Sequence, residues 1–198
     1  LQQFPNGGGA PQREDDEFWA TALELDMRLS PHGNFGYPSP PDYGGGAGTG
    51  SLGYAVSLIQ RTNGFKPLYC IAQLIASGVF DRFPDLRFYF AETNASWLSS
   101  LIWFMDDNYR IFKHWDGPLE MLPSEYIFKH CRFSFIRDPL ALKLRNVVPT
   151  EILMWGSDFP HSVGSFPESQ AWLDEIFDNQ SEELRRQILL ENPCEFFG

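Results

Sequence analysis

Short apolar runs alternate with amphipathic segments along this chain, and that alternation predicts its secondary structure. Residues 152–155 are four large apolar residues in a row, which is typical of a strand buried on both faces of a parallel sheet. Residues 86–91 and 131–135 predict two more strands, and residues 27–30 predict a fourth, shorter one. Strands that alternate with helices in this way indicate an α/β fold with a parallel sheet.

The segments between these strands show helical spacing. The segment after Thr93 and Asn94 carries one apolar stripe from Trp97 to Met105, which predicts a helix with a buried face. The other predicted helices cover residues 14–26, 54–61, 67–77, 125–130, 139–146, 165–177 and 181–190. We expect Asn192 and Pro193 to end the last of them, and Gly156 to let the backbone turn after the strand at 152–155.

A long loop rich in glycine and proline is predicted over residues 33–53, and it contains a formal GxGxxG at residues 48–53. No predicted strand precedes this motif, and no acidic residue follows at the expected distance of about 20 residues. We therefore reject a dinucleotide-binding site.

Each predicted strand is followed by a polar residue that suits a functional site. These residues are His32, Glu92, Asp138 and Asp158. In barrels of alternating strands and helices, side chains at the carboxyl ends of the strands face the site. Asp158 and nearby His161 are therefore candidates for metal ligation or proton transfer, the alternative being a capping aspartate and a surface histidine.

Three other polar side chains are predicted to take no part in the site. His114 and His130 lie among lysines and aromatic residues without a strand-end placement, so we predict that both are surface residues. For Arg137 we expect a salt bridge to Asp138 or another neighbour rather than a contact with a substrate carboxylate.

Composition narrows the functional classes. The 198 residues are 43% hydrophobic, which is enough for one domain over residues 1–198, and the formal charge of -11 argues against nucleic acid as a partner. No apolar run approaches the roughly 20 residues of a membrane helix, so no membrane partner is expected. Three cysteines without CxxC spacing suggest neither a disulfide framework nor a zinc finger, and we predict a cytoplasmic protein. The chain begins at Leu1 within a polar loop, from which we expect a missing upstream part.

Several segments together resemble a known enzyme family. They are residues 25–32 (LDMRLSPH), 78–87 (GVFDRFPDLR), 90–92 with 96–98, 123–126 (PSEY) and 155–161 (WGSDFPH). In this order they are similar to the amidohydrolase-related family, whose metal-dependent (β/α)8 barrels include aminocarboxymuconate semialdehyde decarboxylase. No HxH motif occurs, although the first strand of this family supplies one. The resemblance therefore implies the C-terminal half of a (β/α)8 TIM barrel, about strands 5 to 8, with the N-terminal half absent from this chain.

The resemblance also implies roles for the strand-end residues. His32 occupies the place of a metal-binding histidine after the fifth strand, and Asp158 that of the aspartate that binds the metal or activates its water. Glu92 stands where a histidine is common and is expected to bind metal, to support a ligand or to carry protons. His161 is expected to contact substrate or help transfer a proton.

The activity implied is that of a metal-dependent hydrolase or non-oxidative decarboxylase. It would act on a small cyclic or unsaturated acid or amide through a water activated by a divalent metal, for which zinc is expected. Relatives lead us to expect a homodimer. There are two alternative classes: a non-catalytic α/β remnant that binds a ligand or partner, which the missing HxH would suit, and a serine hydrolase, which the absence of GxSxG disfavours.

Overall fold

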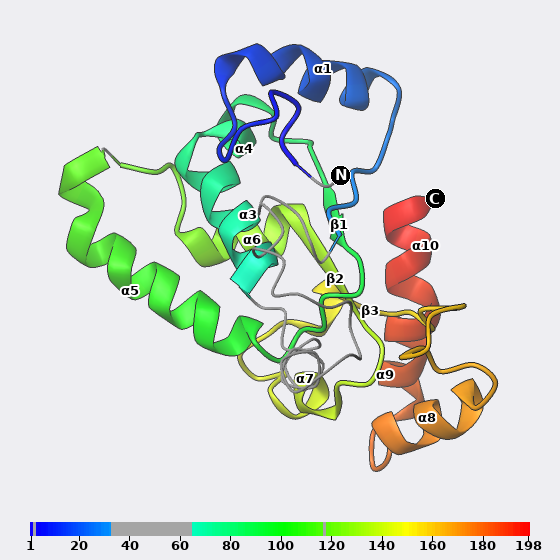
Figure 1. Ribbon diagram of the computed structural model, residues 1–198. Coiled ribbons are helices and arrows are strands. Elements are labelled where there is room, and N and C mark those ends of the chain that lie inside the picture. Colours follow the sequence, from blue (N-terminus) through cyan, green and yellow to red (C-terminus); the bar gives the residue numbers. More distant parts are fainter. Residues whose placement is uncertain (2, 33–64, 117) are drawn as a thin grey trace, which may run out of the picture.

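A three-stranded parallel sheet forms the centre of the computed structural model, which describes residues 1, 3–32, 65–116 and 118–198. The strands are β1 (Phe88–Phe90), β2 (Cys131–Phe135) and β3 (Leu153–Trp155), in the order β1-β2-β3 (Figure 1). The predicted segment at 27–30 lies beside β1 through isolated parallel bridges from Leu29 to Phe88 and from His32 to Ala91. The predicted parallel α/β fold is therefore confirmed, whereas the predicted loop at 33–53 and helix at 54–61 fall outside the described residues.

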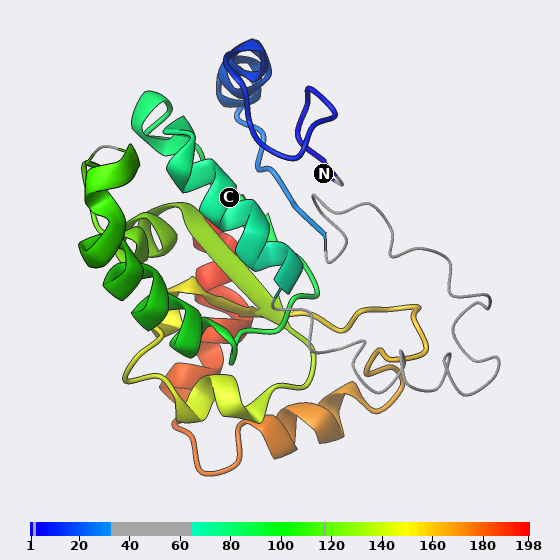
Figure 2. The same ribbon diagram turned by 60° about the vertical axis from the view of Figure 1, so that its left-hand side comes forward.

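One face of the sheet makes the hydrophobic core. The register pairs Phe88 with Cys131 and Phe133 with Leu153, so these side chains share a face, and all are fully buried. Two helices precede β1, namely α3 (Phe65–Ala76) and α4 (Val79–Arg82), and two lie between β1 and β2, namely α5 (Leu98–Asp116) and α6 (Pro123–His130). α3 and α5 lie on one side of the sheet and the C-terminal helices on the other (Figure 2). Both faces of the sheet are covered, which explains the continuous apolar run at 152–155.

The remaining helices agree with the predictions except at the C-terminus. Their bounds are α1 Asp16–Glu24, α7 Pro139–Lys143, α8 Ser169–Ile176, α9 Glu182–Arg186 and α10 Asn192–Phe197, with 3₁₀ turns at Arg13–Asp15 and Thr150–Ile152 and a π-helical segment at Gln187–Glu191. In the described part of the chain, no helix combines the length and apolarity needed to cross a bilayer.

The prediction that Asn192 and Pro193 end the last helix was wrong. The helix continues as α10, because Pro193 lies in its first turn, where proline is tolerated. The side-chain amide of Asn192 donates hydrogen bonds to the carbonyl oxygens of Thr150 and Leu153, both at 2.7 Å, and fastens the helix beneath β3. From there α10 reaches the second face of the sheet, where the Phe196 and Phe197 rings pack against Tyr89.

The prediction that His130 is a surface residue was also wrong. Its side chain is fully buried, and its ring stacks on Phe80 at a centroid distance of 4.2 Å. Nδ1 lies 2.9 Å from the carbonyl oxygen of Leu86. Burial lowers the pKa of His130 from 6.5 to about 4, so the ring is neutral at physiological pH. His130 therefore belongs to the core at the amino ends of β1 and β2, and the His114 side chain falls outside the described residues.

Candidate metal centre

Glu92 stands at the carboxyl end of β1 in an unusual backbone conformation. Its φ of 59° lies in the left-handed region, which non-glycine residues adopt rarely and mostly where the surroundings require it. The backbone N–H of Glu92 donates a hydrogen bond of 3.0 Å to the hydroxyl of Ser134 on β2. This conformation turns the chain off the strand and leaves the Glu92 carboxylate at the edge of the sheet.

Asp158 comes three residues after β3 and shares the left-handed conformation, with a φ of 55°. It opens a tight loop in which the His161 N–H donates to the Asp158 carbonyl at 2.9 Å and the Ser165 N–H to the Ser157 carbonyl at 2.9 Å. The Asp158 side chain is only 3% exposed, against 62% for His161. The loop therefore holds one buried carboxylate beneath one exposed imidazole.

Gly164 is the glycine on which this loop depends. A Cβ atom there would lie 2.8 Å from the carbonyl oxygens of Ser157 and Asp158 and 2.9 Å from that of His161. At Gly156, which was predicted to provide the turn, no atom lies within 4 Å of the corresponding position, and its φ is not positive. The close approach of three carbonyl groups, rather than a special φ, makes glycine necessary in this loop.

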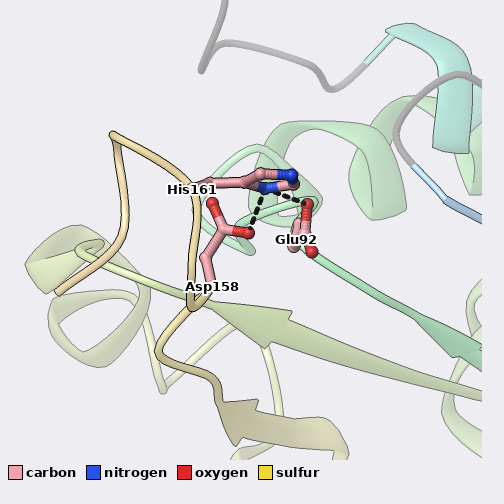
Figure 3. Close-up of side chains that lie close together, drawn as sticks. All are labelled: Glu92, Asp158 and His161. Carbon is pink, nitrogen blue, oxygen red and sulfur yellow. Dashed lines mark hydrogen bonds and ion pairs between the residues drawn. The ribbon is translucent and has the colours of Figure 1, made fainter. Parts of the chain in front are cut away.

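The four predicted site residues come together at this edge of the sheet. His161 Nδ1 lies 2.6 Å from Asp158 Oδ1 and 3.9 Å from Glu92 Oε2. Figure 3 marks both contacts with dashed lines. His32 Nε2 lies 2.9 Å from Glu92 Oε2. The chain thus gathers residues from beside β1, from the end of β1 and from the loop after β3.

The donor atoms suit a divalent cation. Glu92, Asp158 and His161 each offer one ligand atom, and these atoms all lie within 4.8 Å of one another. Ligand atoms at about 2.1 Å from one ion are separated by roughly 3–4 Å, so small side-chain movements complete this set. Two carboxylates and an imidazole are ligands for zinc and manganese alike. His32, the other predicted ligand, lies beside these three and contacts the Glu92 carboxylate, and its role as a ligand stays a prediction.

Asp138, the polar residue after β2, has a structural role instead. Its side chain is 6% exposed, and Oδ2 accepts the N–H groups of Ala95 at 2.9 Å and Ser96 at 2.8 Å, while Oδ1 accepts that of Ala141 at 3.3 Å. It therefore caps α7 and ties the turn after β1 to the end of β2. Arg137 forms an ion pair with Glu175 at 2.5 Å, in agreement with the expected salt bridge to a neighbour.

Sequence reasoning missed the supporting residues Ser134 and Gly164. Ser134 occupies one polar position of an alternating strand, which is equally typical of a side chain with no special partner. Gly164 lies among small residues of an ordinary loop, and nothing in its neighbours announces the three carbonyl groups around it. Asp138 carried a readable signal, because aspartate followed by proline is a common helix start.

The chain is similar to proteins of a known family. The amidohydrolase family model matches residues 1–198. Over 65 residues the chain is 40% identical to 4-sulfomuconolactone hydrolase from Hydrogenophaga intermedia, an alignment covering 30% of this chain and 21% of that protein.

Solved structures show the same fold over most of the chain. An amidohydrolase from Mycobacterium avium subsp. paratuberculosis superimposes with a TM-score of 0.73 at 19% identity, covering 94% of this chain and 46% of that one. A dihydroxybenzoic acid decarboxylase from Polaromonas, solved with manganese and the inhibitor 2-nitroresorcinol, gives 0.70 at 18% identity, covering 94% and 54%. The chain spans about half the length of these relatives, and the predicted partial barrel is confirmed.

Proposed function

Because this chain belongs to the amidohydrolase family, we propose that it carries the metal-binding C-terminal half of a hydrolase or non-oxidative decarboxylase for small cyclic or unsaturated acids. The observation that supports this most directly is the approach of ligand atoms of Glu92, Asp158 and His161 to within 4.8 Å of one another. These residues are separated by up to 69 positions in the sequence, counted from 92 to 161. A role confined to packing would not require two carboxylates and an imidazole to converge at the edge of the sheet where barrel enzymes place their active sites.

Glu92, Asp158 and His161 would hold the cation, with His32 Nε2 within hydrogen-bond distance of Glu92 Oε2. A bound divalent cation supplies Lewis-acid polarisation of a substrate oxygen and lowers the pKa of a water. Zinc was expected from the family resemblance, whereas a related decarboxylase structure contains manganese. We propose that either ion can fill this donor set, since its oxygen and nitrogen ligands suit both.

The remaining chemistry is assigned to the same side chains. The buried Asp158 carboxylate would bind the cation through one oxygen, and its other oxygen would accept a proton from a water. The exposed His161 ring would contact the substrate, and its nitrogen that does not bind the cation would carry a proton to or from it. The His32–Glu92 contact offers a second route for a proton, at the same Glu92 oxygen that His161 approaches.

The substrate class follows from what the relatives share. Decarboxylases of 2,6-dihydroxybenzoate and 5-carboxyvanillate share this fold. The hydrolase with 40% local identity is named for a muconolactone. All of these compounds place a carboxylate or lactone oxygen next to an unsaturated carbon skeleton. We propose such a compound as the substrate.

Metal analysis and turnover test this function together. The purified protein, stripped with a chelator and then titrated with Mn²⁺ or Zn²⁺, is expected to bind one ion per chain by calorimetry. Turnover is measured as CO2 release from 2,6-dihydroxybenzoate and as hydrolysis of an unsaturated lactone, before and after chelation. A protein that takes up neither ion would overturn the proposal and favour a non-catalytic binding module.

A further inference from the structure

We propose that Ser134 is a positioning residue, whose hydroxyl group holds Glu92 in the backbone conformation that brings its carboxylate to Asp158 and His161. This inference rests on the proposed function, because the position of Glu92 matters to the site only if Glu92 binds the metal. The hydrogen bond between Ser134 and Glu92 does not depend on that function. Ser134 lies on β2, one strand away from Glu92, and its side chain is 3% exposed. A neutral serine hydroxyl is a weak ligand beside carboxylates and imidazole, and that of Ser134 accepts the Glu92 N–H, so its effect on the site passes through Glu92.

The hydrogen bond between the two residues holds Glu92 in a strained backbone conformation. Glu92 has a φ of 59°, and a non-glycine residue keeps such a conformation only where its surroundings impose it. The Ser134 hydroxyl accepts the Glu92 N–H at 3.0 Å. Without that acceptor, a part-buried N–H would lack a partner, and the backbone could relax to the extended region preferred by glutamate. The carboxylate would then move away from Asp158.

Contacts on both sides hold Ser134 itself in place. The register pairs it with Met154 of β3, and Tyr89 of β1 is the neighbouring side chain on the same face. The Tyr89 ring is packed in turn against Phe196 and Phe197 of α10.

The rest of the turn after β1 is fastened to β2 independently. The Ala95 and Ser96 N–H groups are accepted by Asp138, so the far end of the turn does not depend on Ser134. Loss of the Ser134 hydroxyl should therefore free Glu92 without releasing α5. This separation makes a local effect on the site measurable.

The test compares Ser134→Ala with Ser134→Thr, which keeps the hydroxyl, and with Ser124→Ala as a matched control. Ser124 lies in the first turn of α6, away from the site, and is also buried. Its hydroxyl donates a hydrogen bond of 2.8 Å to Asp106. We expect Ser134→Ala to weaken Mn²⁺ binding about 10-fold in calorimetry, as removal of a partner behind a ligand commonly does. Ser134→Thr should restore affinity to within about 3-fold, and Ser124→Ala should leave it unchanged. Both alanine variants should lower the melting temperature by about 2–4 °C.

Amide hydrogen exchange at Glu92 provides a readout that does not require metal. The Glu92 N–H should be protected in the wild type and in Ser134→Thr, and should exchange faster in Ser134→Ala. Unchanged protection in Ser134→Ala would overturn the inference, as would an equal loss of Mn²⁺ affinity in Ser124→Ala. If the wild type bound no Mn²⁺, the proposed function would fall, and the exchange at Glu92 would still decide the role of Ser134.

Discussion

The two ends of the sheet use the same kind of side chain in opposite ways. At the carboxyl ends, His32 and His161 are exposed and lie beside the carboxylates of Glu92 and Asp158. At the amino ends, His130 is buried on the ring of Phe80, and its Nε2 has no hydrogen-bond partner among the described residues. Imidazole can bind a cation or transfer a proton in the first setting, whereas the second keeps it neutral.

The backbone conformation also differs between the two ends of the sheet. Glu92 and Asp158 both have positive φ values, and neighbouring hydrogen bonds hold them there. His130 instead is the last residue of the regular helix α6, and β2 begins at the next residue. Two of the five non-glycine residues with a positive φ in the described part of the chain therefore belong to the proposed site, and the other three are Asp26, Asn94 and Asn179. Such conformations are frequent at functional sites.

Removal of the buried carboxylate at the carboxyl end should have the largest effect. Asp158→Asn keeps the shape of the side chain but removes its charge, and a cation held in this site would contribute several kcal/mol to the proposed reaction. We therefore expect kcat/KM to fall about 10³-fold. Steady-state kinetics at saturating Mn²⁺ measure this. A variant within 10-fold of the wild type would remove Asp158 from the centre of the site.

At the amino end, pH should control stability through His130. Its pKa in the folded protein is about 4 against 6.5 unfolded, so the unfolded chain binds more protons between these values. The contribution of the neutral ring to the free energy of unfolding is fully present above pH 6.5. It should fall by about 3 kcal/mol as the pH drops to 4. Urea unfolding of the wild type and of His130→Phe checks this.

The phenylalanine variant should lack that part of the pH dependence, because nothing at position 130 can then be protonated. Its stability at pH 7 should be lower, since the hydrogen bond to Leu86 is lost. Parallel pH curves for the two proteins would contradict the burial of His130 as the cause.

Returning to the carboxyl end, Gly164→Ala should disturb the loop that carries Asp158. The added Cβ would approach three carbonyl oxygens to within 2.9 Å or less. We expect a loss of about 1–3 kcal/mol in the free energy of unfolding, typical of overpacking, with weaker Mn²⁺ binding. Gly156→Ala is the matched control, because nothing lies within 4 Å of its Cβ position. Equal losses in both variants would contradict the close-approach argument.

The smallest effect is expected from the ion pair between Arg137 and Glu175. Both side chains are about half exposed, at 42% and 53%, and such pairs contribute between 0 and about 1 kcal/mol. Glu175→Gln should therefore change the free energy of unfolding by about 0.5 kcal/mol or less and leave Mn²⁺ affinity as it is. A large loss of affinity would show that Arg137 takes part in the site.

Much of the fold could be predicted because its signals are local. The strand at 131–135 has the predicted bounds, and the strand predicted at 152–155 occupies 153–155. The convergence of His32, Glu92 and Asp158 followed from one rule, that parallel strands bring their carboxyl ends to the same edge. His130 was missed because its neighbours Lys129 and Arg132 suggest a surface, while the groups that bury it, including Phe80, come from other parts of the chain.

By itself, the sequence determined where strands and helices alternate and which polar residues follow the strands, because hydrophobic period and chain order are properties of neighbouring residues. Only the tertiary structure decided that His161 and Glu92 stand within reach of one cation, that Ser134 supports Glu92, and that Gly164 admits three carbonyl groups. These facts depend on atoms brought together across the sheet and across a folded loop. Their positions are set by packing and hydrogen bonds between segments that no local pattern records.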